Sequence, residues 1–156
     1  MSKIEVRKIT KIFIHHSASN FGDVKLIEQW HKERGFSTIG YHFVVLNGYR
    51  NSKDYKEGKI NQSEIGLIEK GLDTGKVGIH VAGHNTCSVG ICLIHFDMAY
   101  TDKQLESYRS FTAQLAMVYG IKADDVLGHY EVDRKKPLCP SLNMDVERAI
   151  IKEMMR

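Results

Sequence analysis

Histidines have the widest range of chemistry in this sequence, and their spacing limits the sites that they can form. The chain contains eight histidines and three cysteines among 156 residues. None of the histidines forms the helical HExxH pair that supplies two zinc ligands from one helix, so a metal site must be assembled from distant segments. The histidines lie at positions 15, 16, 31, 42, 80, 84, 95 and 129.

Three residues have the types that such a site needs. His15 ends an apolar run, and His129 precedes Cys139 by ten residues in the segment GHYEVDRKKPLCPS. Two histidines and a cysteine leave the fourth position of a tetrahedral zinc ion open for water, as catalytic zinc sites require. Residue types alone leave two alternatives open. Cys139 could be a thiol nucleophile with His129 as its base, or all three residues could be structural.

The elements that position His15 are a predicted strand and the helix after it. The apolar run predicts a strand over 12–15, which delivers His15 at its end. Asp23 is expected to cap a helix that continues to Arg34 and stops at Gly35. The first part of the chain therefore has a strand followed by a helix.

The next segment predicts a hairpin and a loop. A strand is expected over 41–46, where β-favouring residues cluster. Asn47-Gly48 is typical of a tight hairpin turn, here leading into a strand near Tyr49. Residues 51–75 are polar and rich in Gly and Lys, which indicates a loop or an irregular insertion.

The second half of the chain predicts one strand and two helices. The apolar run over 89–94 indicates a strand. A helix is expected to begin at Thr101, with Gln104 completing a capping box, and to end before Gly120. A shorter amphipathic helix is predicted from about Asp145 to the C-terminus.

This alternation predicts an α/β fold with a mixed central β-sheet flanked by helices. The length suits one hydrophobic core. No repeat or Pro/Ser-rich linker divides the chain, so we expect a single catalytic domain over 1–156. The 22 Lys and Arg are scattered among 19 Asp and Glu, for a net charge of +3. This pattern does not indicate a nucleic-acid-binding surface.

Targeting signals and a disulfide framework are not expected. No apolar run approaches the roughly 20 residues that span a bilayer, and the N-terminus lacks the apolar core of a secretory signal. We therefore expect a protein that is cytoplasmic as synthesised. An odd number of cysteines at irregular spacing argues against a disulfide framework, although a bridge between Cys87 and Cys92 stays open.

Several independent motifs of this sequence occur together in one known family. They are IFIHHSAS, WHKERG followed by GYHFVV, HVAGHNTCSVGICLI, and GHYEV with a later CPS. In order and kind they resemble the amidase-2 superfamily, which contains phage zinc amidases and peptidoglycan recognition proteins. The resemblance covers about four-fifths of the chain and is nearest to the phage branch.

The resemblance implies a zinc site and assigns its ligands. The first histidine after the opening strand, His15, maps to a Zn²⁺ ligand, as do His129 and Cys139. His16 is expected to point to the other side of the strand, because alternate side chains of a strand face opposite ways.

The resemblance also implies residues around the metal. Tyr41, in the GYHF segment, maps to the catalytic tyrosine of the family. His80, Asn85 and Ser88 lie in a segment that resembles part of the substrate groove, with His80 the expected ligand contact. His42, next to Tyr41, is expected to face the other way and to pack.

A catalytic lysine is the point where this sequence departs from the family pattern. Phage relatives place a lysine two residues before the cysteine ligand, and here that position is Pro137. Lys135 and Lys136 lie just upstream in a longer loop. We favour Lys136 as the catalytic lysine because it is nearer to Cys139, with a solvated surface charge as the alternative for both.

The function implied by the resemblance is zinc-dependent hydrolysis of the amide between N-acetylmuramic acid and L-alanine in bacterial peptidoglycan. A phage or prophage endolysin is expected, acting as a monomer on a muropeptide substrate after a membrane-permeabilising partner releases it to the cell wall. The alternative is a muropeptide-binding module without catalysis. Inhibition of an RNA polymerase is a possible second activity.

Overall fold

A five-stranded mixed β-sheet forms the centre of the computed structural model, which describes residues 7–156. The strands are β1 (Lys11–His16), β2 (Phe43–Asn47), β3 (Ile65–Lys70), β4 (Ser88–Leu93) and β5 (Val126–Gly128), in the order β3-β2-β4-β1-β5. β1 is parallel to β4 and β5, and β2 is parallel to β4, whereas β3 runs antiparallel to β2 at one edge. The carboxyl ends of four strands therefore lie at the same edge of the sheet.

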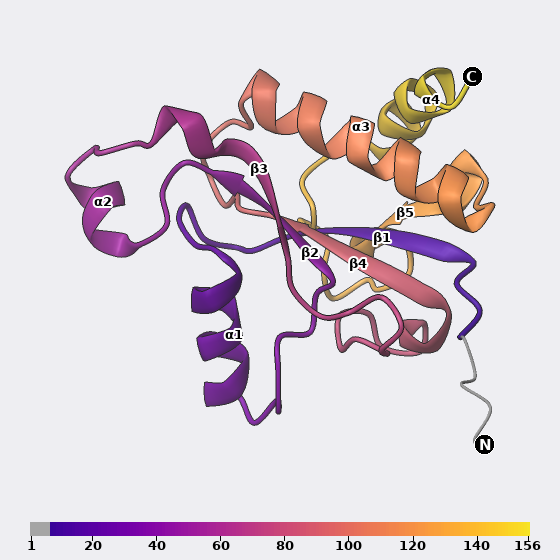
Figure 1. Ribbon diagram of the computed structural model, residues 1–156, viewed down its shortest axis with the longest axis horizontal. Coiled ribbons are helices and arrows are strands. Elements are labelled where there is room, and N and C mark those ends of the chain that lie inside the picture. The colour runs from indigo at the N-terminus through magenta and orange to yellow at the C-terminus, as the bar shows by residue number, and fades with distance from the viewer. Residues whose placement is uncertain (1–6) are drawn as a thin grey trace.

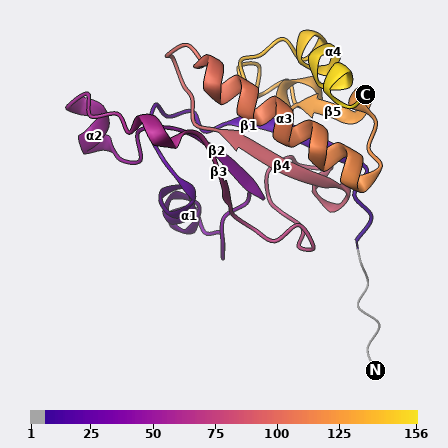
Figure 2. The same ribbon diagram turned by 45° about the horizontal axis from the view of Figure 1, so that its top comes forward.

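Helices cover both sides of this sheet. α3 (Asp102–Tyr119) and α4 (Met144–Met154) lie on one side, and α1 (Val24–Glu33) lies on the other (Figure 1). The turned view keeps α3 and α4 together and α1 opposite them (Figure 2). The predicted α/β fold with a mixed sheet flanked by helices is confirmed. No helix within residues 7–156 combines the length and the apolar character that a membrane crossing requires.

The two faces of the sheet have separate apolar cores. Ile12 and Ile14 of β1 pack with residues of α3 and α4 in the larger cluster. Cys92 of β4 packs with Ile27 of α1 in the smaller cluster. Because side chains alternate along a strand, His15 points away from α3 and α4, toward the face that α1 covers in part.

The predicted helix ends are confirmed where a side chain or a glycine caps the helix. Asp23 Oδ1 accepts a hydrogen bond from the Leu26 N–H at 2.8 Å, and Thr101 caps α3 through the Gln104 N–H at 3.1 Å. Gly120 ends α3 in the left-handed conformation with φ +66°, which glycine adopts without a steric penalty. The predicted capping box is wrong on one side, because the buried Gln104 amide donates to the Ile94 carbonyl at 2.9 Å.

The prediction of a tight hairpin at Asn47-Gly48 is wrong. The chain turns away after β2, and the antiparallel partner of β2 is β3 rather than a strand near Tyr49. Asn47 explains the change of direction, because its side-chain amide donates to the Asn20 carbonyl at 2.8 Å and its Oδ1 accepts from the Tyr49 N–H at 3.1 Å. These bonds tie the end of β2 to a neighbouring loop.

The prediction that residues 51–75 form a loop is also wrong. The segment contains a short helix, α2 (Ser52–Lys56), and the strand β3. β3 is an edge strand whose side chains are partly exposed, and the apolar stretch of its sequence IGLIEK is short and contains a glycine, which makes it a weak strand signal. β5 was not predicted either, because three residues are too short to show a periodic pattern.

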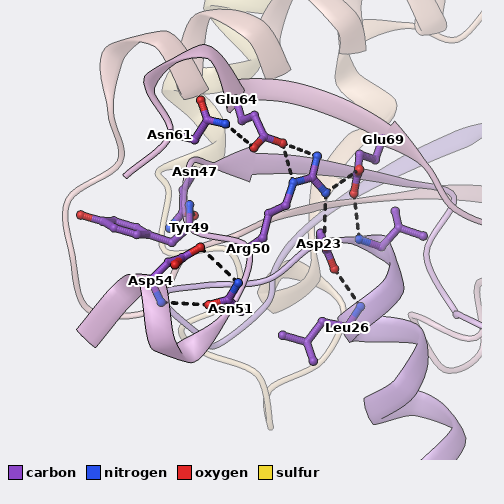
Figure 3. A network of polar contacts seen from close by, with 11 residues as sticks. Asp23, Leu26, Asn47, Tyr49, Arg50, Asn51, Asp54, Asn61, Glu64 and Glu69 are labelled. Atoms are coloured by element: carbon purple, nitrogen blue, oxygen red, sulfur yellow. Dashed lines mark hydrogen bonds and ion pairs between the residues drawn. The ribbon is translucent and has the colours of Figure 1, made fainter. Parts of the chain in front are cut away.

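An ion-pair network fixes the long connection between β2 and β3. Arg50 Nη1 lies 3.1 Å from Asp23 Oδ2 and 2.9 Å from Glu69 Oε2, and the guanidinium also pairs with Glu64 (Figure 3). Glu69 in turn accepts a hydrogen bond from the Val24 N–H at 3.0 Å. Since Asp23 and Glu69 both bond the first turn of α1, the network fixes the start of that helix.

We expect Arg50→Met to lower the free energy of unfolding by about 1–2 kcal/mol, because three carboxylates lose their shared cation. Arg50 is 34% exposed, so solvent screening keeps the loss moderate. Urea denaturation of the metal-free protein measures this change. Lys59→Met removes an exposed pair with Glu57 and is the control, with an expected loss below about 0.5 kcal/mol. Equal losses in the two variants would contradict the role of the network.

Candidate metal centre

His15 and His129 meet because β1 and β5 are neighbouring parallel strands. Ile14 pairs with Gly128 in the register of the two strands, and each of these residues is followed by one of the histidines. The loop that follows His129 brings Cys139 back to the two histidines. The His15 and His129 Nδ1 atoms are 3.2 Å apart, and Cys139 Sγ lies 3.8 Å from His15 Nδ1.

The three side chains fit a tetrahedral metal ion. Zinc at normal bond lengths separates two histidine nitrogens by about 3.3 Å, and a nitrogen and a sulfur by about 3.6 Å. The observed separations of 3.2 and 3.8 Å are close to these values, and all three donor atoms lie within 4.8 Å of one another. Two imidazoles and a thiolate form a donor set that zinc prefers.

The second ring nitrogen of each histidine has its own partner. His15 Nε2 lies 2.9 Å from His80 Nδ1, and His129 Nε2 lies 3.6 Å from Asp133 Oδ2. Such contacts orient metal-binding histidines in proteins. Glu131, the other carboxylate near His129 in sequence, pairs instead with Arg148 at 2.7 Å.

Burial determines the protonation of the two histidines. Burial, reinforced by the neighbouring His80 and His129, lowers the pKa of His15 well below its usual value. Burial also lowers the pKa of His129, against the opposing effect of Asp133. Both rings are therefore neutral near pH 7, which is the form that binds metals.

Cys139 does not have the electrostatic environment of a thiol nucleophile. Burial raises the pKa of its thiol to about 11, with the His16 backbone N–H and Lys136 opposing that rise. The His16 N–H donates to Cys139 Sγ at 3.4 Å. Reactive cysteines have a lowered pKa, so these surroundings argue against a thiol nucleophile.

An open cavity of about 370 Å³ lies beside these donors. Tyr41 lines it, with its ring centroid 5.1 Å from that of His15. Burial, followed by the neighbouring Cys92 and Cys139, raises the pKa of Tyr41 well above its usual value, so the phenol keeps its proton. Lys136 also lines the cavity, and Lys135 is not among the described residues that do.

The three residues expected to contact substrate take different positions. His80 and Asn85 line the cavity, and Asn85 Oδ1 accepts hydrogen bonds from the His80 and Val81 N–H groups at 3.0 and 2.8 Å. Ser88 is fully buried behind His80, and its hydroxyl lies 3.2 Å from His80 Nε2. The structure thus brings two of the three residues to the cavity surface.

The other expectations for histidines and cysteines fit the structure. The His16 Nδ1 lies 3.2 Å from His95 Nδ1, as expected for a side chain that points away from His15, although His16 also lines the edge of the cavity. His42 is buried, and its Nδ1 accepts from the Gly90 N–H at 3.0 Å. Cys87 and Cys92 are free thiols, so the bridge between them is not formed.

Sequence reasoning missed one side of the cavity. His31, Arg34 and Phe36 line it from the end of α1 and the loop that follows. The Arg34 guanidinium lies 5.4 Å from the centroid of the Phe36 ring, a cation–π geometry. A charged residue at a helix end is common on any protein surface, so the sequence has no signal for this position.

Comparison with known proteins identifies related sequences and structures. A family model described as N-acetylmuramoyl-L-alanine amidase matches residues 5–141. The chain is 34% identical over 144 residues to the endolysin of Escherichia phage T7, covering 85% of this chain and 81% of that endolysin. It is 30% identical over 157 residues to the endolysin of Klebsiella phage KP32, covering 92% and 90%.

Solved structures share the fold. The N-acetylmuramoyl-L-alanine amidase LysC from Clostridium intestinale superposes with a TM-score of 0.72 at 25% identity, covering 92% of this chain and 85% of that chain. Drosophila Peptidoglycan Recognition Protein (PGRP)-SA superposes with a TM-score of 0.64 at 20% identity, covering 87% and 75%. The second likeness concerns the fold alone.

We expect alkylation of Cys139 in the metal-free protein to be slow at about pH 7 and to accelerate about tenfold per pH unit up to about pH 9. The reason is that burial raises the pKa of this thiol to about 11, so little thiolate exists in that range. Peptide mass spectrometry after iodoacetamide treatment distinguishes Cys139 from Cys87 and Cys92. A rate already maximal at neutral pH would indicate a stable thiolate and would favour the nucleophile.

Proposed function

The chain belongs to the N-acetylmuramoyl-L-alanine amidase family, and we propose that it is a zinc-dependent phage endolysin. Its enzymatic activity is hydrolysis of the amide between N-acetylmuramic acid and L-alanine in peptidoglycan. The observation that carries the zinc proposal is the convergence of His15, His129 and Cys139 beside an open cavity. The phage relatives support the role in lysis.

His15, His129 and Cys139 would hold the metal through two nitrogens and one sulfur. When bound, zinc polarises the amide carbonyl and activates water for attack on it. The protein's part is to keep both imidazoles neutral by burial and to leave one side of the donor set facing the cavity. A muropeptide in the cavity then has its scissile amide next to the donors.

Tyr41 and Lys136 would act on the substrate from the cavity wall. The Tyr41 phenol keeps its proton and can donate a hydrogen bond to the carbonyl oxygen as negative charge develops there. The Lys136 ammonium offers a second, cationic donor from the loop before Cys139. Either group also carries a proton that can pass to the leaving nitrogen of L-alanine.

In this role the protein works as a monomer on the bacterial cell wall. The proposal includes synthesis in the cytoplasm and a separate membrane-permeabilising partner that gives the enzyme access to peptidoglycan. The proposed catalytic domain extends over 1–156, of which residues 1–6 lie outside the described part of the structure.

Digestion of purified peptidoglycan tests the reaction directly. Mass spectrometry of the soluble products should find free stem peptides that begin with L-alanine, together with glycan whose muramic acid keeps its lactyl group. Shortened glycan with intact stems would contradict the amidase. Binding to peptidoglycan without any release of peptide would support the muropeptide-binding module.

Chelation should abolish hydrolysis, and added Zn²⁺ should restore it. His129→Ala and Cys139→Ala should each lose most of the bound zinc, because an incomplete donor set holds the metal weakly. Elemental analysis of the purified variants measures zinc per chain. Cys87→Ala is the matched control, since this thiol is only half-buried and lies outside the donor set. Full zinc content in Cys139→Ala would refute the proposed site.

Tyr41→Phe should keep zinc and muropeptide binding while slowing turnover. The ring still packs beside His15, but the hydroxyl donor is lost, which should reduce kcat by about tenfold or more. Steady-state kinetics at matched zinc content separate kcat from KM. Tyr49→Phe, outside this cavity, is the control, and an equal kcat for Tyr41→Phe and the parent would exclude a catalytic hydroxyl.

Lys136→Ala should slow hydrolysis by at least about tenfold, which corresponds to about 1.4 kcal/mol in the barrier. Lys135→Ala is the matched control, because it removes the same charge from the same loop but not from the cavity wall. Kinetics are compared at equal zinc content. If neither variant slows hydrolysis by at least about tenfold relative to the parent, no lysine of this loop stabilises the transition state.

A further inference from the structure

A chain of hydrogen bonds runs from His15 into the protein, away from the candidate metal centre. His15 Nε2 lies 2.9 Å from His80 Nδ1, and His80 Nε2 lies 3.2 Å from Ser88 Oγ. The Ser88 hydroxyl donates to the His84 carbonyl at 2.8 Å. The chain thus begins at a proposed zinc ligand and ends at a backbone oxygen.

The last bond determines the direction of all the others. A carbonyl oxygen can only accept, so it takes the single proton of the Ser88 hydroxyl. Ser88 Oγ must then accept its other bond from the His80 Nε2–H. A neutral imidazole carries one N–H, so His80 Nδ1 is a lone pair that accepts from the His15 Nε2–H.

We propose that His80 and Ser88 are positioning residues that hold His15 as its Nε2–H tautomer and so keep the lone pair of His15 Nδ1 available for the metal. This inference rests on the proposed function only in naming the metal as the recipient of that lone pair. The tautomer itself follows from the hydrogen bonds of the protein.

Burial protects this chain of hydrogen bonds from water. His15 and Ser88 are fully buried, and His80 is 8% exposed. In such a buried site, a proton on the wrong ring nitrogen leaves a polar atom without a hydrogen-bond partner, which costs about 1–3 kcal/mol. The opposite tautomer of His15 would place a proton on the nitrogen that faces His129 Nδ1 at 3.2 Å.

The sheet is shaped to hold the His80 ring. A Cβ atom at Gly90 of β4 would lie 2.7 Å from Cγ and Nδ1 of His80, closer than such contacts occur. Asn85 fixes the backbone of His80 from the other side, through a hydrogen bond from the His80 N–H at 3.0 Å. The ring therefore has little freedom to turn away from His15.

The two proposed ligand histidines are thus oriented by different means. His129 faces a carboxylate, Asp133, which attracts its Nε2–H through charge. His15 faces a neutral imidazole, and its orientation depends on the direction of hydrogen bonds that Ser88 sets. Loss of such outer contacts commonly weakens metal binding by about 10–100-fold.

Nuclear magnetic resonance of the ¹⁵N-labelled, metal-free protein tests the tautomer. Long-range ¹H–¹⁵N correlations should place the proton of both His15 and His80 on Nε2. In Ser88→Ala, which removes the acceptor for the His80 Nε2–H, the share of His15 with its proton on Nδ1 should rise. A parent protein with the His15 proton on Nδ1 would overturn the proposal, whether or not the protein binds zinc.

Zinc affinity, measured by competition with a chromophoric chelator, tests the consequence. Ser88→Ala and His80→Leu should bind zinc about 10–100-fold more weakly than the parent. His80→Asn should recover most of that loss, because its side-chain oxygen can accept from the His15 Nε2–H. Ser107→Ala, which removes a serine bond to the Gly66 carbonyl, is the matched control and should bind as the parent does.

Thermal melting of each metal-free variant shows whether the fold is kept. If His80→Leu does not fold, the zinc affinity of Ser88→Ala alone tests the proposal. Parent-like zinc affinity in a folded Ser88→Ala would overturn the proposal. A parent that binds no zinc would contradict the proposed function instead, and the tautomer measurement would still stand.

Discussion

The parallel pairing of β1 with its two neighbours is the constraint on which the rest of the structure depends. Parallel strands bring their carboxyl ends to one edge, and the register of β1 and β5 sets His15 beside His129. β1 is also an internal strand of the sheet, between β4 and β5, and its core residues are fully buried. A strand held on both sides cannot slip by one residue without moving His15 to the opposite face.

Much of the fold could be predicted because its inner elements follow simple rules. The strands at 12–15 and 89–94 are apolar runs, and α1 and α3 have capping residues at their first turns. β3 and β5 could not be predicted, since one is a partly exposed edge strand and the other has three residues. The hairpin predicted at Asn47-Gly48 is wrong because the Asn47 side chain bonds a loop that is distant in sequence, and no local pattern reveals such a contact.

The candidate site was predictable in its residue types and not in its geometry. The resemblance to the amidase-2 superfamily is confirmed by the family match, and it pointed to His15, His129 and Cys139 as ligands. Their convergence depends on β5, which the sequence did not reveal. The places of Arg34, at the cavity, and of Ser88, behind His80, also come from tertiary packing. The metal-binding role of the three residues stays a prediction.

Gly90 is a position at which this protein should tolerate substitution poorly. It lies in the middle of a buried strand and carries no functional group, yet one added carbon atom would press on the ring that orients His15. A survey of single substitutions would therefore find this glycine as intolerant of change as the proposed ligands, although it has no side chain that could bind metal or substrate. The His80 ring occupies the space that a side chain at position 90 would need, so the missing side chain of Gly90 is part of how the sheet shapes the site.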